Sequence, residues 1–294
     1  MNIFRYWAWV NSEEAGPDGR PYSFTLKRGS DLSQEDARQK AERASKELMA
    51  RIRDGGEPPA WYEYSTRQLP EPILDEIHDD AGQRIAAVTI NRFGCEVLNT
   101  QSLAFLDIDL VPLSTPKRGG LLARLFGGGT DPEAEKLAQA TAMEGAISQL
   151  RSWVARNKGT SVRVYRTSAG LRYLFVSPTM NPGDALHQPV YEELGCDPLY
   201  RRLCVAQDCF RARLSPKPWR IGVEPSPVWR VDRLDEQPQV YEQWHSAYLD
   251  KARHYAACEL LETVGAAQTN DPSCERLIVL HDERSGVGSG LPLA

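Results

Sequence analysis

Two aspartates, Asp107 and Asp109, lie two positions apart in the short apolar run Leu103–Leu110. The run is too short for a typical helix, and its composition favours a buried strand. Side chains at i and i+2 of a strand point to one face, so the two carboxylates should lie side by side. Mutual repulsion should raise one pKa unless a cation such as Mg²⁺ or Mn²⁺ lies between them. The pair indicates either a metal site for phosphoryl chemistry or a strand end whose acids face solvent.

A second group of residues with chemical potential lies between positions 196 and 233. The segment has eight Lys or Arg and four Asp or Glu, in a chain of net charge −5. Pro216 and Pro218 exclude a helix or a central strand there, and Trp219 and Trp229 are interleaved with the charges. Basic residues beside aromatic ones suit a phosphate backbone and stacked bases. A solvated loop with packed tryptophans is the alternative.

Arg172 lies inside an apolar stretch, Leu171–Val176, which follows the turn Thr167–Gly170. The pattern predicts a hairpin strand, and Gly170 allows a close backbone approach in the turn. An arginine in such a strand needs an anionic partner. That partner is a structural acid, a ligand phosphate or a carboxylate of the metal site.

The composition is that of an ordinary folded protein, with 41% hydrophobic and 26% charged residues among 294. One or two domains are expected. The negative net charge gives no general attraction to nucleic acid or to an anionic membrane, so such contacts would need a local basic patch. The six cysteines lack metal-ligand spacing and are expected to be reduced. No segment resembles a signal peptide or a membrane span, so we expect a cytoplasmic protein without a membrane partner.

The sequence predicts two strands at the start of the chain, near residues 3–10 and 22–26. A helix should follow from the capping box at 33–36 to about residue 53. They predict an N-terminal ββα unit over residues 1–57. It is either an extension packed on the main domain or a contact module. We expect a core over residues 58–235. A C-terminal helical segment with a flexible tail should follow over residues 236–294.

The core should contain short strands at 84–91 and 103–110, a helix over 131–157, and the hairpin at 161–176. This order predicts an α+β fold with a central antiparallel sheet that carries the acids. The helices at 131–157 and 238–264 should pack on that sheet. The Pro-, Gly- and Arg-containing segment 111–130 is interpreted as a mobile excursion that could clamp a substrate.

Three motifs in this order resemble those of the archaeo-eukaryotic primase, or primase-polymerase, superfamily. The first is Phe105-Leu-Asp-Ile-Asp109, similar to the acid-bearing strand of the family. The second is Thr167-Ser-Ala-Gly-Leu-Arg-Tyr-Leu-Phe175, in which Arg172 stands where the family has a histidine. The third is Asp208, followed by Phe210-Arg-Ala-Arg-Leu-Ser-Pro216. The resemblance covers residues 84–220 and implies an RRM-like catalytic sheet.

The resemblance implies metal-dependent nucleotidyl transfer from a nucleoside triphosphate onto a nucleic-acid primer and template. Mg²⁺ or Mn²⁺ would be bound by three catalytic acids: Asp107, Asp109 and Asp208. Nucleotide phosphates would be bound by Ser168, Arg172, Arg211 and Arg213. Nucleic acid would be bound by Lys217, Trp219 and Arg220. Arginine binds phosphate but stays charged, so Arg172 would not donate a proton readily.

Three other functions fit the same residues. They are an inactive primase-like domain that binds nucleic acid or nucleotide, a nuclease that uses the same acids, and a structural or protein-interaction domain. Both metal-dependent enzymes require the three acids to converge. A binding module requires an exposed basic face around 211–220. A structural domain predicts that Arg172 forms an ion pair with Asp107 or Asp109.

Overall fold

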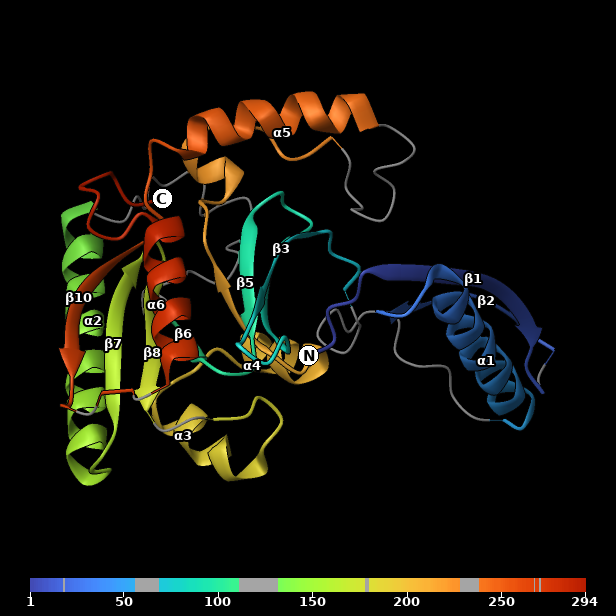
Figure 1. Cartoon of the computed structure of the whole chain (residues 1–294), viewed down its shortest axis with the longest axis horizontal. Coiled ribbons are helices and arrows are strands. Elements are labelled where there is room, and N and C mark those ends of the chain that lie inside the picture. The colour runs from blue at the N-terminus through green and yellow to red at the C-terminus, as the bar shows by residue number, and fades with distance from the viewer. Residues whose placement is uncertain are drawn as a thin grey trace, which may run out of the picture.

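The computed structural model describes most of the chain, namely residues 1–17, 19–55, 69–110, 132–177, 180–227, 238–266, 268–269 and 271–294. The described residues have the α+β class that the sequence predicts (Figure 1). They form six α-helices and three antiparallel sheets, with the core divided between two four-stranded sheets where one central sheet was expected. The segment 111–130, Trp229 and both expected domain boundaries lie outside these residues. None of the described helices is long and apolar enough to cross a membrane.

The N-terminal unit has the expected ββα order. Strands β1 (Tyr6–Ala15) and β2 (Pro21–Ser30) form a hairpin, and α1 (Gln34–Arg53) covers one face of it. Ser33 caps the helix by accepting a hydrogen bond from the Asp36 N–H. Alternate positions of both strands face the helix, which buries small apolar clusters between them. The unit extends to one side of the remaining chain (Figure 1).

The acid-bearing sheet has the strand order β10-β7-β8-β6. Its strands are β6 (Ala104–Asp109), β7 (Ser161–Thr167), β8 (Gly170–Ser177) and β10 (Cys258–Val264). Helix α2 (Pro132–Arg156) covers one face, where the Tyr173 hydroxyl donates to the Ala146 carbonyl at 3.1 Å. Helix α6 (Pro272–Ser285) covers the other, where the His281 ring packs against Phe105 and Tyr165. Arg172 precedes Tyr173 on β8 and therefore faces α6.

The second sheet has the order β3-β4-β5-β9. Its strands are β3 (Ile73–His78), β4 (Arg84–Ile90), β5 (Glu96–Thr100) and β9 (Phe210–Arg213). Helix α4 (Pro198–Gln207) joins this sheet to the first through Tyr200. The Tyr200 hydroxyl donates to the Phe105 carbonyl of β6 at 3.0 Å and accepts from the Arg211 N–H of β9 at 3.4 Å. The acid-bearing strand and the basic strand are thus held next to each other.

The C-terminal segment differs from the expected single helix over 238–264. It forms α5 (Pro238–Ala252) and then strand β10, which pairs with β7 at the edge of the acid-bearing sheet. Exposed and less exposed residues alternate along β10, which is the period of a strand with one covered face. Helix α3 (Gln188–Glu193) and the 3₁₀-helices η2 (Ala185–His187) and η3 (Pro218–Ile221) complete the described elements.

Candidate functional site

The aspartate pair lies at the end of β6, as the sequence predicts. Asp107 is half-buried and pairs in register with Arg172 on β8, whereas Asp109 is exposed and pairs with Gly170. A Cβ atom on Gly170 would lie 2.0 Å from the Ile108 carbonyl oxygen, so only glycine allows the two strands to approach this closely. Gly170 therefore brings the turn between β7 and β8 against the acids.

Two carboxylates, one on the same strand and one at the start of α4, act on Asp109. Desolvation, together with the charges of Asp107 and Asp197, raises the pKa of Asp109. Lys217 and Arg220 oppose this effect with their positive charges. The expected repulsion between the paired acids is therefore present, and it is only partly relieved by neighbouring cations.

Asp197, at the start of α4, is the third acid near this pair. Its backbone N–H donates to the Asp107 carbonyl at 2.9 Å. Its carboxylate caps α4 by accepting from the N–H groups of Leu199 and Tyr200, both at 3.0 Å. Asp197 therefore adds negative charge to the site while its oxygens are occupied by the helix end.

Asp208 does not complete the expected triad with Asp107 and Asp109. It ends α4 in the left-handed conformation, with φ of 49°. Its carboxylate accepts from the amino group of Met1 at 2.8 Å and from the Gln101 side chain at 2.7 Å. In the described part of the chain, no group of three or more His, Cys, Asp or Glu residues is arranged to hold a metal ion. The acidic site consists of the Asp107–Asp109 pair.

Arg172 is 5% exposed, and its guanidinium is bound by neutral groups. Nη1 lies 2.9 Å from His281 Nε2 and 3.9 Å from Cys258 Sγ. The ion pair with Asp107 or Asp109 that a structural domain predicts is not formed between these described residues. Burial lowers the pKa of His281 to about 4, so its ring is neutral at pH 7 and can accept this hydrogen bond.

Three further cations lie near the acids: Arg213 at the end of β9, and Lys217 and Arg220 in the segment that follows it. Each has a lowered pKa, with burial as the largest cause. Repulsion from Arg172 and Arg220 contributes at Arg213, and repulsion from Arg213 and Arg220 contributes at Lys217. Together with Arg172, these residues form the cation cluster. The charges of Arg213, Lys217 and Arg220 act on Asp107, and those of Lys217 and Arg220 also act on Asp109. The described residues provide no ion pair for any member of the cluster.

Two members of the cation cluster have unused hydrogen-bonding capacity. Nη1 of Arg213 and Nη1 of Arg220 are buried and have no hydrogen-bond partner among the described residues. A buried guanidinium N–H without an acceptor is costly, and neighbouring like charges add to that cost. The arrangement is therefore complementary to an anion with several oxygen atoms.

The backbone that carries these cations is held by α5 and β5. The Tyr248 hydroxyl donates to the Pro216 carbonyl at 2.8 Å and lies 2.7 Å from the Ser215 hydroxyl. The Leu214 N–H donates to the Glu96 carbonyl at 2.8 Å. Pro216 and Pro218 end the strand and restrict the backbone further. Arg213, Lys217 and Arg220 are thus displayed from a segment with few conformational options.

The other residues predicted for the site have different surroundings. Arg211 Nη2 lies 2.8 Å from both carboxylate oxygens of Glu71, and both side chains are largely buried. Ser168 lies in the turn beside Gly170 and is half-buried. Trp219 is 49% exposed. Of the phosphate-binding residues expected from sequence, the structure brings Arg172 and Arg213 into the cation cluster and places Arg211 in a buried ion pair.

Sequence reasoning missed Asp197 and His281. The Asp-Pro pair at 197–198 is a helix-start signal that predicts a cap, but it says nothing about proximity to β6. His281 lies four residues after Leu277 and seven after Cys274, and all three are buried on one face of α6. That spacing identifies a packed histidine without identifying Arg172 as its partner.

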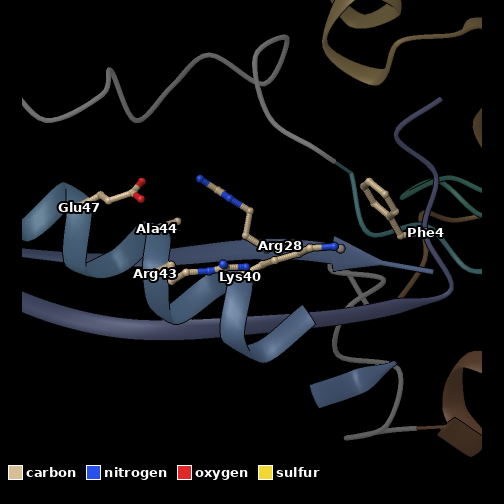
Figure 2. A pocket seen from close by; sticks show the side chains of 7 residues that line it. Phe4, Arg28, Lys40, Arg43, Ala44 and Glu47 are labelled. Carbon is tan, nitrogen blue, oxygen red and sulfur yellow. The ribbon is translucent and has the colours of Figure 1, made fainter. Parts of the chain in front are cut away.

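A separate open pocket with a volume of about 370 Å³ lies on the N-terminal unit. Figure 2 shows Phe4 at one end, Glu47 at the other, and Arg28, Lys40 and Arg43 between them. Lys40 forms an ion pair with Asp36 at 2.7 Å, and Arg43 also acts on that carboxylate. Residues 1–57 contain as many Asp and Glu as Lys and Arg. The pocket's basic side chains are therefore partly neutralised by Asp36 and Glu47, unlike those of the cation cluster.

No family model matches this chain, and no match was found among the curated proteins or the solved structures.

Proposed function

We propose that this chain is a primase-polymerase-like protein that binds a nucleoside triphosphate with a divalent metal ion and transfers the nucleotidyl group to a nucleic-acid primer. The observation that carries the proposal is the position of the cation cluster beside Asp107 and Asp109. Four cations without ion pairs among the described residues are suited to the charge of a triphosphate. The two carboxylates supply the opposite charge that a metal ion requires.

The acid pair is a suitable donor set for Mg²⁺ or Mn²⁺. Two carboxylates share one face of β6, and their repulsion contributes to the raised pKa of Asp109. Hard divalent cations prefer such oxygen ligands and would relieve that repulsion. When bound, the metal would polarise phosphate oxygens and neutralise charge that develops during transfer.

The protein's own groups would hold and orient the triphosphate. Arg172, Arg213 and Arg220 can donate charge-assisted hydrogen bonds to its oxygens, and Lys217 adds a compact charge. In the proposed transfer, a primer hydroxyl oxygen bonds to the α-phosphorus while the bond to pyrophosphate breaks. The cation cluster would stabilise the charge that collects on the leaving pyrophosphate.

A second candidate function is nucleotide binding without transfer. It is favoured by the position of Asp208, whose carboxylate binds Met1 and Gln101 instead of joining the acid pair. A site with two carboxylates can hold a metal–triphosphate complex and yet lack the third acid that the resemblance implies. The two functions share the same binding site and differ only in whether product forms.

Primer extension distinguishes these functions. A labelled primer on a template is incubated with nucleoside or deoxynucleoside triphosphates and either metal ion, and the expected result is primer elongation. Asp107→Asn/Asp109→Asn should abolish it, whereas Asp250→Asn, at an exposed ion pair with Arg253, should not. Triphosphate binding without elongation under any condition would reject transfer and leave the binding function.

A further inference from the structure

An aromatic surface adjoins the cation cluster, with Trp219 exposed and Phe93 half-buried. The rings of Phe93 and Trp219 meet edge to face, with centroids 5.2 Å apart and an interplanar angle of 83°. We call these two side chains the Phe93–Trp219 platform. Cations flank both rings, with Lys217 Nζ 5.4 Å from the Trp219 centroid and Arg92 Cζ 4.6 Å from the Phe93 centroid. Trp219 is 49% exposed, which is unusual for so large an apolar side chain.

Trp219 is displayed by a rigid segment. It lies in η3 between Pro218 and Ile221, both of which are buried. Ile221 packs with Tyr248 and Ala252 of α5, and Val223 N–H donates to the Pro218 carbonyl at 2.9 Å. The backbone on either side is therefore anchored, while the indole remains at the surface. An anchored aromatic loses little conformational entropy when a ligand stacks on it.

Phe93 is displayed by the tight turn between β4 and β5. The Asn91 side chain accepts from the Phe93 N–H at 2.9 Å and from the Cys95 N–H at 3.1 Å. Gly94 has φ of +79°, and a Cβ atom there would lie 2.6 Å from the Trp244 ring. Helix α5 thus packs directly on the turn and limits its movement. Both halves of the platform are consequently pre-organised.

The platform and the cation cluster are continuous through Lys217. This residue lies over the Trp219 ring, and its charge also acts together with Arg213, Arg220 and Asp107. A ligand with a flat π-system joined to several phosphates could contact both surfaces at once, the π-system on the platform and the phosphates in the cation cluster. Stacking on an exposed aromatic suits any nucleobase, because every base has a π-face.

We infer that the Phe93–Trp219 platform binds the base of a nucleoside triphosphate whose phosphates occupy the cation cluster. The inference rests on the proposed function and adds the nucleoside as the part of the ligand that the platform recognises. It makes nucleotides, rather than inorganic polyphosphates, the preferred ligands. Because stacking tolerates all four bases, the platform should select for the presence of a base and not for its identity.

Calorimetric titrations with ATP and with inorganic triphosphate, each with Mg²⁺, test this inference. Trp219→Ala should weaken ATP binding about tenfold, the loss of one stacked base, and should leave triphosphate binding unchanged. Trp219→Phe should retain most of the ATP affinity. Trp9→Ala is the matched control, since Trp9 is 47% exposed on the N-terminal unit. It should bind both ligands as the wild type does.

Equal ATP affinities of the wild type and Trp219→Ala would overturn the inference that the platform binds the base, and would leave the proposed function intact. An equal loss of ATP and triphosphate affinity would also overturn it, since Trp219 would then position the cation cluster without contacting a base. If Trp219→Ala weakens binding of a single-stranded oligonucleotide but not of ATP, the platform holds a template base and the inference is wrong. Failure of the wild type to bind either ligand would overturn both proposals.

Discussion

Nη1 of Arg172 lies 2.9 Å from Nε2 of His281, and Nδ1 of His281 lies 2.9 Å from Oδ1 of Asp282. A guanidinium can only donate, so Nε2 must accept and Nδ1 must carry the proton that Asp282 accepts. Arg163 and the Tyr165 hydroxyl also donate to Asp282, at 2.5 and 2.8 Å. Arg172 is therefore oriented by a neutral acceptor, and its charge remains available to an anion.

Replacing His281 by leucine should weaken the site and the fold together. The change removes the acceptor from a buried guanidinium N–H, which should reduce the free energy of unfolding by about 1.5–3 kcal/mol. Triphosphate affinity should also fall, since Arg172 is no longer oriented. His281→Gln supplies an amide oxygen and should recover part of both losses in urea unfolding and calorimetry. Recovery of stability without recovery of affinity would show that His281 only packs the core.

The stability of the protein should decrease in acid because of His281. The pKa of this residue falls from 6.5 to about 4 on folding, so the unfolded chain binds more protons between these values. The free energy of unfolding therefore falls as the pH drops through this window, by at most about 3 kcal/mol from this group. Asp282, whose pKa is lowered by its contacts with His281 and Tyr165, extends the loss to more acidic pH.

Urea unfolding at neutral pH and at about pH 4.5 measures this dependence. His281→Gln should have a smaller difference between the two conditions than the wild type, because its side chain does not titrate. The same difference in both proteins would contradict a buried neutral histidine.

Arg213→Met should separate stability from ligand binding. The guanidinium is buried, lies near other cations, and has one unpartnered nitrogen, so an apolar side chain should be neutral or stabilise the free protein by about 1 kcal/mol. Inorganic triphosphate should raise the Tm of the wild type and raise that of the variant much less.

Arg166→Met is the control for Arg213→Met, since Arg166 forms an exposed ion pair with Glu259. Its Tm and its response to triphosphate should both resemble those of the wild type. Marked destabilisation by Arg213→Met, with a normal response to triphosphate, would assign Arg213 a structural role.

Arg211→Met should mainly destabilise the fold. Its partner Glu71 is almost fully buried and also accepts from the Thr89 hydroxyl at 2.6 Å. Removing one member of a buried ion pair costs about 3–5 kcal/mol, because the remaining charge is left uncompensated. Glu71→Gln should destabilise for the same reason, and the double variant should lose less than the sum. Additive losses in urea unfolding would show that the pair is not coupled.

The sequence was sufficient to predict the local features of the site. The i, i+2 spacing of Asp107 and Asp109 determines their common face once the strand is recognised. Gly170 identifies the turn that approaches them, and Pro216 and Pro218 identify the end of the basic strand. The α+β class and the N-terminal ββα order follow from the same periodicities and caps.

Long-range partners could not be predicted from these patterns. Arg211 and Arg213 lie two positions apart on the same strand and have similar neighbours in the sequence. Only Arg211 forms an ion pair with Glu71, about 140 positions away in the sequence. Asp208 precedes the arginines as the resemblance requires, but the left-handed end of α4 directs it to Met1. Strand β10 was mistaken for a helical continuation because its pairing with β7 joins segments far apart in the chain.

The most direct test of the central claim is calorimetric titration of the protein with Mn²⁺, with and without a nucleoside triphosphate. The wild type should bind Mn²⁺ more tightly when the triphosphate is present, because metal and phosphates share one site. Asp107→Asn/Asp109→Asn should abolish metal binding, whereas Asp250→Asn should not change it. If Mn²⁺ does not bind the wild type in either condition, or binds the double variant equally well, the acid pair and the cation cluster do not form a metal–triphosphate site.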